Sequence, residues 1–177
     1  MLTPAKGTLK SKPFALLQEW RVNSTETREN ETIIVNKLIV NRNMTLTLVN
    51  CSLLVNSSVE NRGKIEVYGA LVLRNHTTIR ASNASIGYFF YLYSTSTFNG
   101  SDSTIRDVGR NANPLRERGI HIKSAKATIQ NMIITNCQEG LIFTAPGLLR
   151  INSSQIVGNG VGIRISDEGS NITVENC

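Results

Sequence analysis

The sequence Gly119-Ile120-His121-Ile122 returns as Gly140-Leu141-Ile142-Phe143 and again as Gly162-Ile163-Arg164-Ile165, after intervals of 21 and 22 residues. The first and third copies alternate apolar and polar side chains, which is the period of a half-buried β-strand. A fixed interval of about 20 to 30 residues is typical of stacked repeat folds. These copies therefore predict strands that lie on one another in successive turns of a solenoid.

Three apolar columns recur with this period. The first column contains Leu48, Leu73, Phe98, Ile129, Ile151 and Val174. The second column contains Leu54, Ile79, Ile105, Ile134 and Ile156. The third column contains Ile39, Ile65, Tyr91, Ile120, Leu141 and Ile163. Their constant order predicts three strands per turn and parallel pairing between turns, so the expected fold is all-β, a single-stranded right-handed parallel β-helix of about six turns.

A polar column follows two residues after each member of the first column. Its members are Asn50, Asn75, Gly100, Asn131, Ser153 and Asn176. Residues of these types tolerate left-handed backbone geometry, and stacked amides hydrogen-bond along a column. We therefore expect a structural asparagine ladder inside the coil, formed by Asn50, Asn75, Asn131 and Asn176.

The repeat also divides the chain into segments. Residues 1–30 lack the period and are expected to cap the coil, with Pro13 to Arg21 as a short helix or an irregular cover. Residues 31–177 form the parallel β-helix, and longer intervals indicate an inserted loop at 109–118. The last turn has no cap, so either the chain is a fragment or a neighbouring molecule covers this end.

The repeats from Gly119 to Asn176 resemble those of the right-handed β-helix superfamily, of the NosD and carbohydrate-binding or sugar-hydrolase type. Thr45-Leu46-Thr47-Leu48-Val49-Asn50 and Gly69-Ala70-Leu71-Val72-Leu73-Arg74-Asn75 look like N-terminal turns of archaeal cell-surface members. The resemblance covers about residues 31 to 177. It implies the fold and leaves the activity open, because the superfamily includes lyases, hydrolases, adhesins, phage spikes and inert spacers.

Asn-X-Ser/Thr triplets, the acceptors of N-linked glycans, occur at ten of the 19 asparagines. Two of them, Asn50 and Asn75, belong to the expected ladder. The eight expected N-glycosylation sites are Asn23, Asn30, Asn43, Asn56, Asn83, Asn99, Asn152 and Asn171. Their number favours an exported protein at the cell surface, although repeated turns alone also favour Asn followed by Ser or Thr.

Charge, hydropathy and cysteine content narrow the partners. The formal charge of +6 is mild for a nucleic-acid binder, so no nucleic acid is expected. No stretch of about 20 apolar residues predicts a transmembrane segment. Cys51 and Cys177 are expected five turns apart, too far for an intrachain disulfide, and Cys137 is expected to be a small buried residue.

Catalytic groups are sparse in the sequence. Glycan lyases and hydrolases need clustered or paired carboxylates, whereas Asp102, Asp107, Asp167 and Glu168 are isolated in the predicted register. His76 and His121 are not spaced as metal ligands. We therefore expect no catalytic residue, no metal and no cofactor.

Two groups of residues are candidates for ligand binding. The aromatic group is Tyr88, Tyr91 and Tyr93, because alternation must turn some of these rings outward, where flat rings suit sugar faces. The cationic group is Arg106, Arg110, Arg116 and Arg118, which suits an anionic glycan or phosphate. The alternatives are that the rings are covered by the loop or the N-terminal segment, and that the arginines belong to a solvated loop.

The leading hypothesis is a non-catalytic extracellular module that is structural or interacts with a glycan or another cell-surface polymer. A polysaccharide lyase or hydrolase is the alternative from another class. A third hypothesis is a fibre or surface-layer subunit that stacks end to end as a homo-oligomer through unpaired strand edges.

Overall fold

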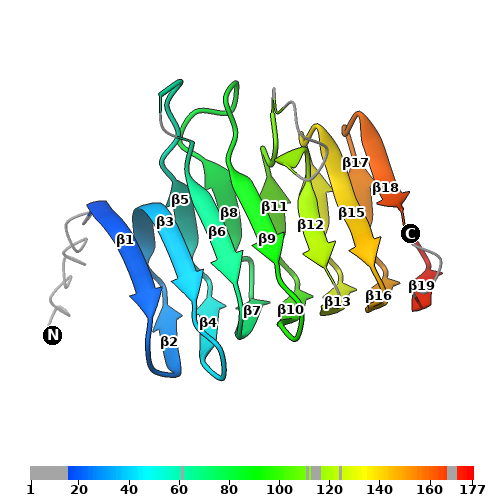
Figure 1. Cartoon of the computed structure of the whole chain (residues 1–177), viewed down its shortest axis with the longest axis horizontal. Coiled ribbons are helices and arrows are strands. Elements are labelled where there is room, and N and C mark those ends of the chain that lie inside the picture. Colours follow the sequence, from blue (N-terminus) through cyan, green and yellow to red (C-terminus); the bar gives the residue numbers. More distant parts are fainter. Residues whose placement is uncertain (1–15, 61, 111, 113–116, 124, 167–170) are drawn as a thin grey trace, which may run out of the picture.

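The computed structural model describes residues 16–60, 62–110, 112, 117–123, 125–166 and 171–177. Within these ranges the regular structure consists of nineteen β-strands wound into a parallel solenoid (Figure 1). Every strand pair in it is parallel. The all-β parallel β-helix expected from the sequence is therefore confirmed.

The strands stack in three ribbons, named here by their place in Figure 1. The lower sheet contains β2 (Glu26–Glu29), β4 (Thr45–Val49), β7 (Ala70–Arg74), β10 (Thr97–Ser101), β13 (Lys126–Gln130), β16 (Leu148–Asn152) and β19 (Asn171–Glu175). The rear ribbon contains β5 (Ser52–Val55), β8 (Thr78–Ala81), β11 (Thr104–Arg106), β14 (Ile133–Thr135) and β17 (Gln155–Val157). The front ribbon contains β1 (Leu16–Val22), β6 (Lys64–Val67), β9 (Phe89–Leu92), β12 (Ile120–Lys123), β15 (Glu139–Ala145) and β18 (Val161–Ile165).

The coil has about five turns of three separate strands, from β4–β6 to β16–β18, where about six were expected. The difference arises at β3 (Thr32–Val40), which pairs with β5 through its first half and with β6 through its second. One unbroken strand thus serves both the rear and the front ribbon in the first turn.

In two inward columns, some members lie one position away in the sequence from those expected. The rear column is Leu53, Ile79, Ile105, Ile134 and Ile156. The front column is Leu38, Ile65, Phe90, Ile120, Leu141 and Ile163. The expected members Leu54, Ile39 and Tyr91 were wrong, because each lies in a run of apolar residues where the side-chain alternation does not show which neighbour points inward.

The lower sheet carries two inward columns. One is Leu46, Leu71, Phe98, Ala127, Leu149 and Ile172, and the other is Leu48, Leu73, Gly100, Ile129, Ile151 and Val174. Phe98 was expected in the second column, where Gly100 lies instead. A Cβ at Gly100 would overlap Met132 Sδ, so the Met132 side chain fills the space that a larger residue would occupy.

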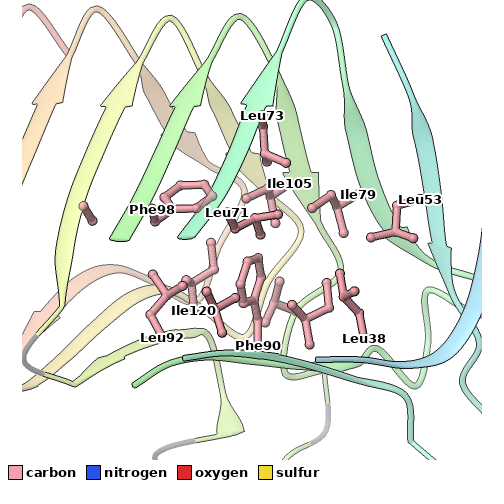
Figure 2. Close-up of a cluster of buried hydrophobic side chains, with 14 of the residues drawn as sticks. Leu38, Leu53, Leu71, Leu73, Ile79, Phe90, Leu92, Phe98, Ile105 and Ile120 are labelled. Atoms are coloured by element: carbon pink, nitrogen blue, oxygen red, sulfur yellow. The ribbon is translucent and has the colours of Figure 1, made fainter. Parts of the chain in front are cut away.

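The inward side chains of all three ribbons form one continuous core (Figure 2). Leu38, Phe90 and Ile120 of the front ribbon lie opposite Leu71 and Phe98 of the lower sheet (Figure 2). Phe90 and Phe98 meet edge to face with centroids 6.1 Å apart. Full burial of each such side chain stabilises the fold by about 1.5–3 kcal/mol, so the columns rather than local propensity hold the coil together.

The corner between the lower sheet and the rear ribbon carries the polar column, and we call it the asparagine corner. Its residues with positive φ are Asn30, Asn50, Asn75, His76, Asp102, Asn131, Ser153 and Asn176. Asp102 takes the place expected for Gly100. The four expected ladder asparagines are exposed, so the prediction of an internal ladder was wrong. Buried residues follow several of these left-handed positions, among them Cys51, Thr77 and Ser103.

The N-terminal segment also differs from expectation. Leu16–Val22 is the strand β1 rather than a short helix or an irregular cover, and it pairs in parallel with β3. Pairing with β3 satisfies backbone groups that the strand edge would otherwise leave open, which outweighs the local helical tendency. The expected cover at residues 1–15 lies outside the described residues.

The connection between β11 and β12 is where the inserted loop was expected. Gly109, Arg110, Ala112, Glu117 and Arg118 lie outside the strands there, and residues 111 and 113–116 are not among the described ones. Across the described ranges, no helix has the length and apolar character of a membrane span.

Candidate functional site

The front ribbon, which lies nearest the viewer in Figure 1, carries aromatic side chains on the surface that faces away from the core. We call this surface the tyrosine face. Its aromatic members are Tyr68, Phe89, Tyr91, Tyr93 and His121. The rings of Tyr68 and Tyr93 stack in parallel, with centroids 4.3 Å apart and an interplanar angle of 4°. Tyr91 lies 6.0 Å from Tyr93 and 6.0 Å from the His121 ring. The three tyrosines are half-buried, which leaves part of each ring open to a ligand.

Two carboxylates accept hydrogen bonds from the tyrosine hydroxyls. Tyr93 donates to Glu66 at 3.3 Å, and Tyr91 donates to Glu117 at 3.3 Å. Lys37 in turn forms an ion pair with Glu66 at 2.8 Å. Burial, followed by the hydrogen bond with Tyr68, raises the pKa of Tyr93 well above its ordinary value. This phenol therefore stays neutral and keeps its proton for hydrogen bonding.

Basic side chains outnumber acidic ones on the tyrosine face. The basic residues are Arg21, Lys37, Arg62, Lys64, Arg118, Lys123 and Arg164, and the acidic ones are Glu19, Glu66, Glu117 and Glu139. Arg62 and Lys64 lie 5.6 Å and 5.9 Å from the centroid of Phe89. Seven basic and four acidic groups leave an excess of three positive charges, half of the chain's formal +6.

Glu139 anchors the two arginines nearest the last turn. Its carboxylate is 3% exposed and accepts hydrogen bonds from Arg164 Nε at 2.6 Å and Nη2 at 3.1 Å. Arg118 Nη1 lies 3.8 Å from the same carboxylate. The hydrogen bonds to Glu139 raise the pKa of Arg164. These contacts connect β15, β18 and the segment before β12, so their role is structural.

Tyr88 does not belong to the tyrosine face. It is fully buried, next to the bridge that it forms with Val108 after β11. Burial raises its pKa well above the ordinary value, with smaller effects of Cys137 and Asp107. The expectation that Tyr88 contacts a ligand was therefore wrong, because its side chain lies in the core with those of Phe90 and Leu92.

Two of the arginines expected to act together, Arg106 and Arg110, are linked through Asp107 and Asn136. Arg106 is exposed on β11 of the rear ribbon and lies 3.4 Å from Asp107. Arg110 donates to the Asn136 side chain at 3.2 Å. Only Arg118 adjoins the tyrosine face, and Arg116 lies outside the described residues.

The isolated acids serve the corners of the coil. Asp102 has a φ of 47° and accepts a hydrogen bond from Asn131 at 3.2 Å. Asp107 has a φ of 67°, is buried and accepts a hydrogen bond from Asn136. Asp167 and Glu168 are not among the described residues. Within the part of the chain that the structure describes, no three His, Cys, Asp or Glu side chains gather as metal ligands.

Six of the eight expected glycan acceptors are exposed, and the other two, Asn56 and Asn152, are half-buried. Asn56 donates to Asn36 at 2.8 Å and accepts from Ser82 at 3.2 Å. Cys51 and Cys137 are buried and Cys177 is exposed, as the prediction of a buried Cys137 required.

The sequence analysis missed Tyr68, Phe89, Glu66, Glu117 and His121 as members of this site. Register pairs Glu66 with Tyr91 and Tyr91 with His121 on successive turns. Assigning Tyr91 to the inward column hid this outer column. Placing Phe90 instead of Tyr91 in the third inward column would have shown that Glu66, Tyr91 and His121 share the outer surface.

No protein-family model, curated protein or solved structure matches this chain. The class that the fold defines is therefore the parallel β-solenoid, a repeat protein with an aromatic, basic outer face.

Proposed function

We propose that this chain is a non-catalytic module of the cell surface that binds an anionic glycan across the tyrosine face. The observation that carries the proposal is the gathering of Tyr68, Tyr91 and Tyr93 with paired carboxylates and an excess of basic residues on one ribbon. The archaeal cell-surface character suggested by the repeats forms part of the same proposal.

The aromatic side chains supply the contact area for a sugar chain. Half-exposed tyrosines offer ring edges and hydroxyls, and sugars combine apolar ring faces with many hydroxyl groups. The stacked pair Tyr68 and Tyr93 comes from neighbouring turns, which lie about 4.8 Å apart. A linear polymer running along the coil axis would meet successive rings and the carboxylates Glu66 and Glu117.

The basic side chains select the charge of the polymer. Lys37 and Lys64 lie on the outer side of adjacent turns, and Lys123 lies two turns beyond Lys64. An excess of positive charge favours carboxylated, sulfated or phosphorylated sugars over neutral ones. Because these groups are largely exposed, binding should weaken as ionic strength rises.

Export to the cell surface is supported by the acceptor triplets. Exposed asparagines such as Asn23, Asn43 and Asn99 are accessible to a glycosyl transferase. N-glycosylation at these sites would place the module outside the cytoplasm, where a surface polymer is available.

Affinity electrophoresis tests the binding proposal. The purified chain should be retarded in gels containing polygalacturonate or a sulfated glycan, more than in gels with neutral hydroxyethyl cellulose. Tyr91→Ala and Lys123→Ser should reduce the retardation, the lysine change by about 1.5- to 5-fold in affinity at low salt. Lys126→Ser is the matched control, because Lys126 is equally charged and exposed but lies on the lower sheet.

Equal losses from Lys123→Ser and Lys126→Ser would contradict a site on the tyrosine face, and no retardation in any gel would contradict glycan binding. Turnover of the polymer that Asp102→Asn or Arg106→Ala abolishes would contradict a non-catalytic module.

A second candidate function is end-to-end assembly. Ile165 and Val174 belong to inward columns but are 53% and 48% exposed, because no described strand stacks on β18 or β19. A second copy stacking on these strands would bury both side chains. Sedimentation analysis should then show association that Ile165→Lys abolishes, and a monomer at every concentration would contradict it.

A further inference from the structure

Three acceptor triplets lie on successive turns of the asparagine corner. They begin at Asn30, Asn50 and Asn75. The backbone N–H of Asn30 donates to Val49 O at 3.0 Å, and that of Asn50 donates to Arg74 O at 3.1 Å. The ladder of the lower sheet thus continues into the corner, and neighbouring acceptors lie about one strand spacing, 4.8 Å, apart.

The three acceptors are not equivalent. Asn50 Nδ2 donates a hydrogen bond to Asn30 Oδ1 at 2.8 Å. Asn30 uses only its oxygen in this contact, so its Nδ2 is left for another bond. Asn50 Nδ2, in contrast, already donates a hydrogen bond to the neighbouring Asn30. All three side chains are exposed, so access alone does not distinguish them.

A groove of about 250 Å³ opens beside these acceptors. It is lined by Asn30, Glu31, Thr32, Asn50, Cys51, Ser52, His76 and Thr78. The hydroxyls of Thr32, Ser52 and Thr78 lie in register on β3, β5 and β8. The groove is smaller than the roughly 300–1,000 Å³ of sites for whole ligands, so it suits a single sugar ring.

We propose that the asparagine corner is a glycan-attachment site in which Asn30 carries the glycan, its first sugar lies in the groove, and Asn50 is excluded. The proposal rests on the export that the proposed function includes. In the attachment step, Asn30 Nδ2 bonds to the anomeric carbon of a sugar carried by a lipid-linked phosphate donor. The bond from that carbon to the phosphate oxygen breaks, the phosphate leaves with the electron pair, and Nδ2 gives up one proton.

Exclusion follows from the stack. Two branched oligosaccharides cannot leave the protein from side chains one strand spacing apart without overlap, since carbon atoms in contact need about 3.5–4.0 Å and sugars carry substituents on every side. A glycan on Asn50 would crowd those on both Asn30 and Asn75. Asn75 is two spacings from Asn30, about 9.6 Å, so these two acceptors are compatible.

The experiment uses the full chain, secreted from a glycosylating host behind an added export signal and purified as folded protein. Intact mass and peptide mapping should find sugar on Asn30 and none on Asn50. The double variant Asn30→Gln/Asn75→Gln should open Asn50 to modification, whereas Asn43→Gln, which removes a distant acceptor, should not. Folded molecules with glycans on both Asn30 and Asn50 would overturn the exclusion.

The groove is tested by NMR. The chain has two histidines, and His76 lines the groove whereas His121 lies on the front ribbon. Enzymatic removal of the glycan should shift the His76 signals and leave those of His121 in place. Unchanged His76 signals would contradict the placement of the first sugar in the groove. Sugar at other acceptors but none on Asn30 would contradict only the proposal that Asn30 carries the glycan. Sugar on none of the ten acceptors would also contradict the proposal that the chain is exported and glycosylated.

Discussion

Met132 Sδ lies where the first side-chain carbon of any larger residue at Gly100 would be placed. The two residues together fill one level of an inward column of the lower sheet. We predict that Gly100→Ala lowers the free energy of unfolding by about 1 kcal/mol, near the lower end of overpacking costs, because the end of a methionine side chain can move. Met132→Ala should cost about 2–5 kcal/mol by leaving a cavity.

In urea unfolding, the double variant Gly100→Ala/Met132→Ala should lose less free energy of unfolding than the sum of the losses in the two single variants. Strict additivity would show that the two side chains do not share this space.

The asparagine corner requires left-handed backbone geometry. Asn131 has a φ of 49° and its amide donates to Asp102. Asn131→Ala should lower the free energy of unfolding by about 1–2 kcal/mol, because a Cβ without a local polar partner disfavours this conformation. Asn131→Gly should lose less, since glycine adopts positive φ freely. If both variants lost the same amount, the hydrogen bond rather than the backbone would decide stability. Thr128→Ala, on an exposed strand position, is the control.

Thr77 supports the inner side of the same corner. It is fully buried, accepts a hydrogen bond from Cys51 N at 3.2 Å and donates to Arg74 O at 2.8 Å. Thr77→Val leaves a buried N–H without its partner, so we expect a loss of about 1–3 kcal/mol in urea unfolding. Thr77→Ser keeps the hydroxyl and should be milder. A valine variant as stable as the serine variant would show that water replaces the hydroxyl.

Alkaline pH should destabilise the fold through buried acids. Burial raises the pKa of the Cys137 thiol from 9.0 to about 12. A raised folded-state pKa means that the stabilisation is complete below pH 9 and is lost as pH rises from 9 to about 12. The free energy of unfolding should fall over this window, and less steeply in Cys137→Ala. Cys177→Ala should keep the wild-type slope, since Cys177 is exposed. If the free energy of unfolding fell equally steeply with pH in all three proteins, the Cys137 thiol would not be the source of the effect.

The period of the repeat was sufficient to predict the fold, because Ile129, Ile151 and Val174 recur in a constant order and do stack in register. It was insufficient where neighbours are equally apolar, as at Leu53 and Leu54, since burial on one face then depends on the bend of the preceding corner. The strand at Leu16–Val22 was missed for a different reason. Its residues pair with residues of β3 that lie 18 positions later, and this pairing outweighed the local helical tendency.

The candidate site was predictable only in part. Tyr91 and Tyr93 were identified by composition, but their partners Glu66 and Glu117 come from segments 25 or more residues away. Tyr88 looked equivalent to them in sequence, but its side chain lies in the core on the same side as that of Phe90. Contacts such as that of Tyr91 with Glu117 depend on the path of a connection, which alternation does not encode.

Cross-linking between turns tests the parallel coil most directly. Thr128 pairs with Arg150, and Arg150 pairs with Thr173, on the exposed side of the lower sheet. In a Cys177→Ser background, Thr128→Cys/Arg150→Cys should form an intramolecular disulfide, because Cα atoms one spacing apart lie within the usual 4.4–6.8 Å. Thr128→Cys/Thr173→Cys should not, since two turns separate its members. The opposite result, read by mass spectrometry after mild oxidation, would contradict the stacking on which the fold and the tyrosine face depend.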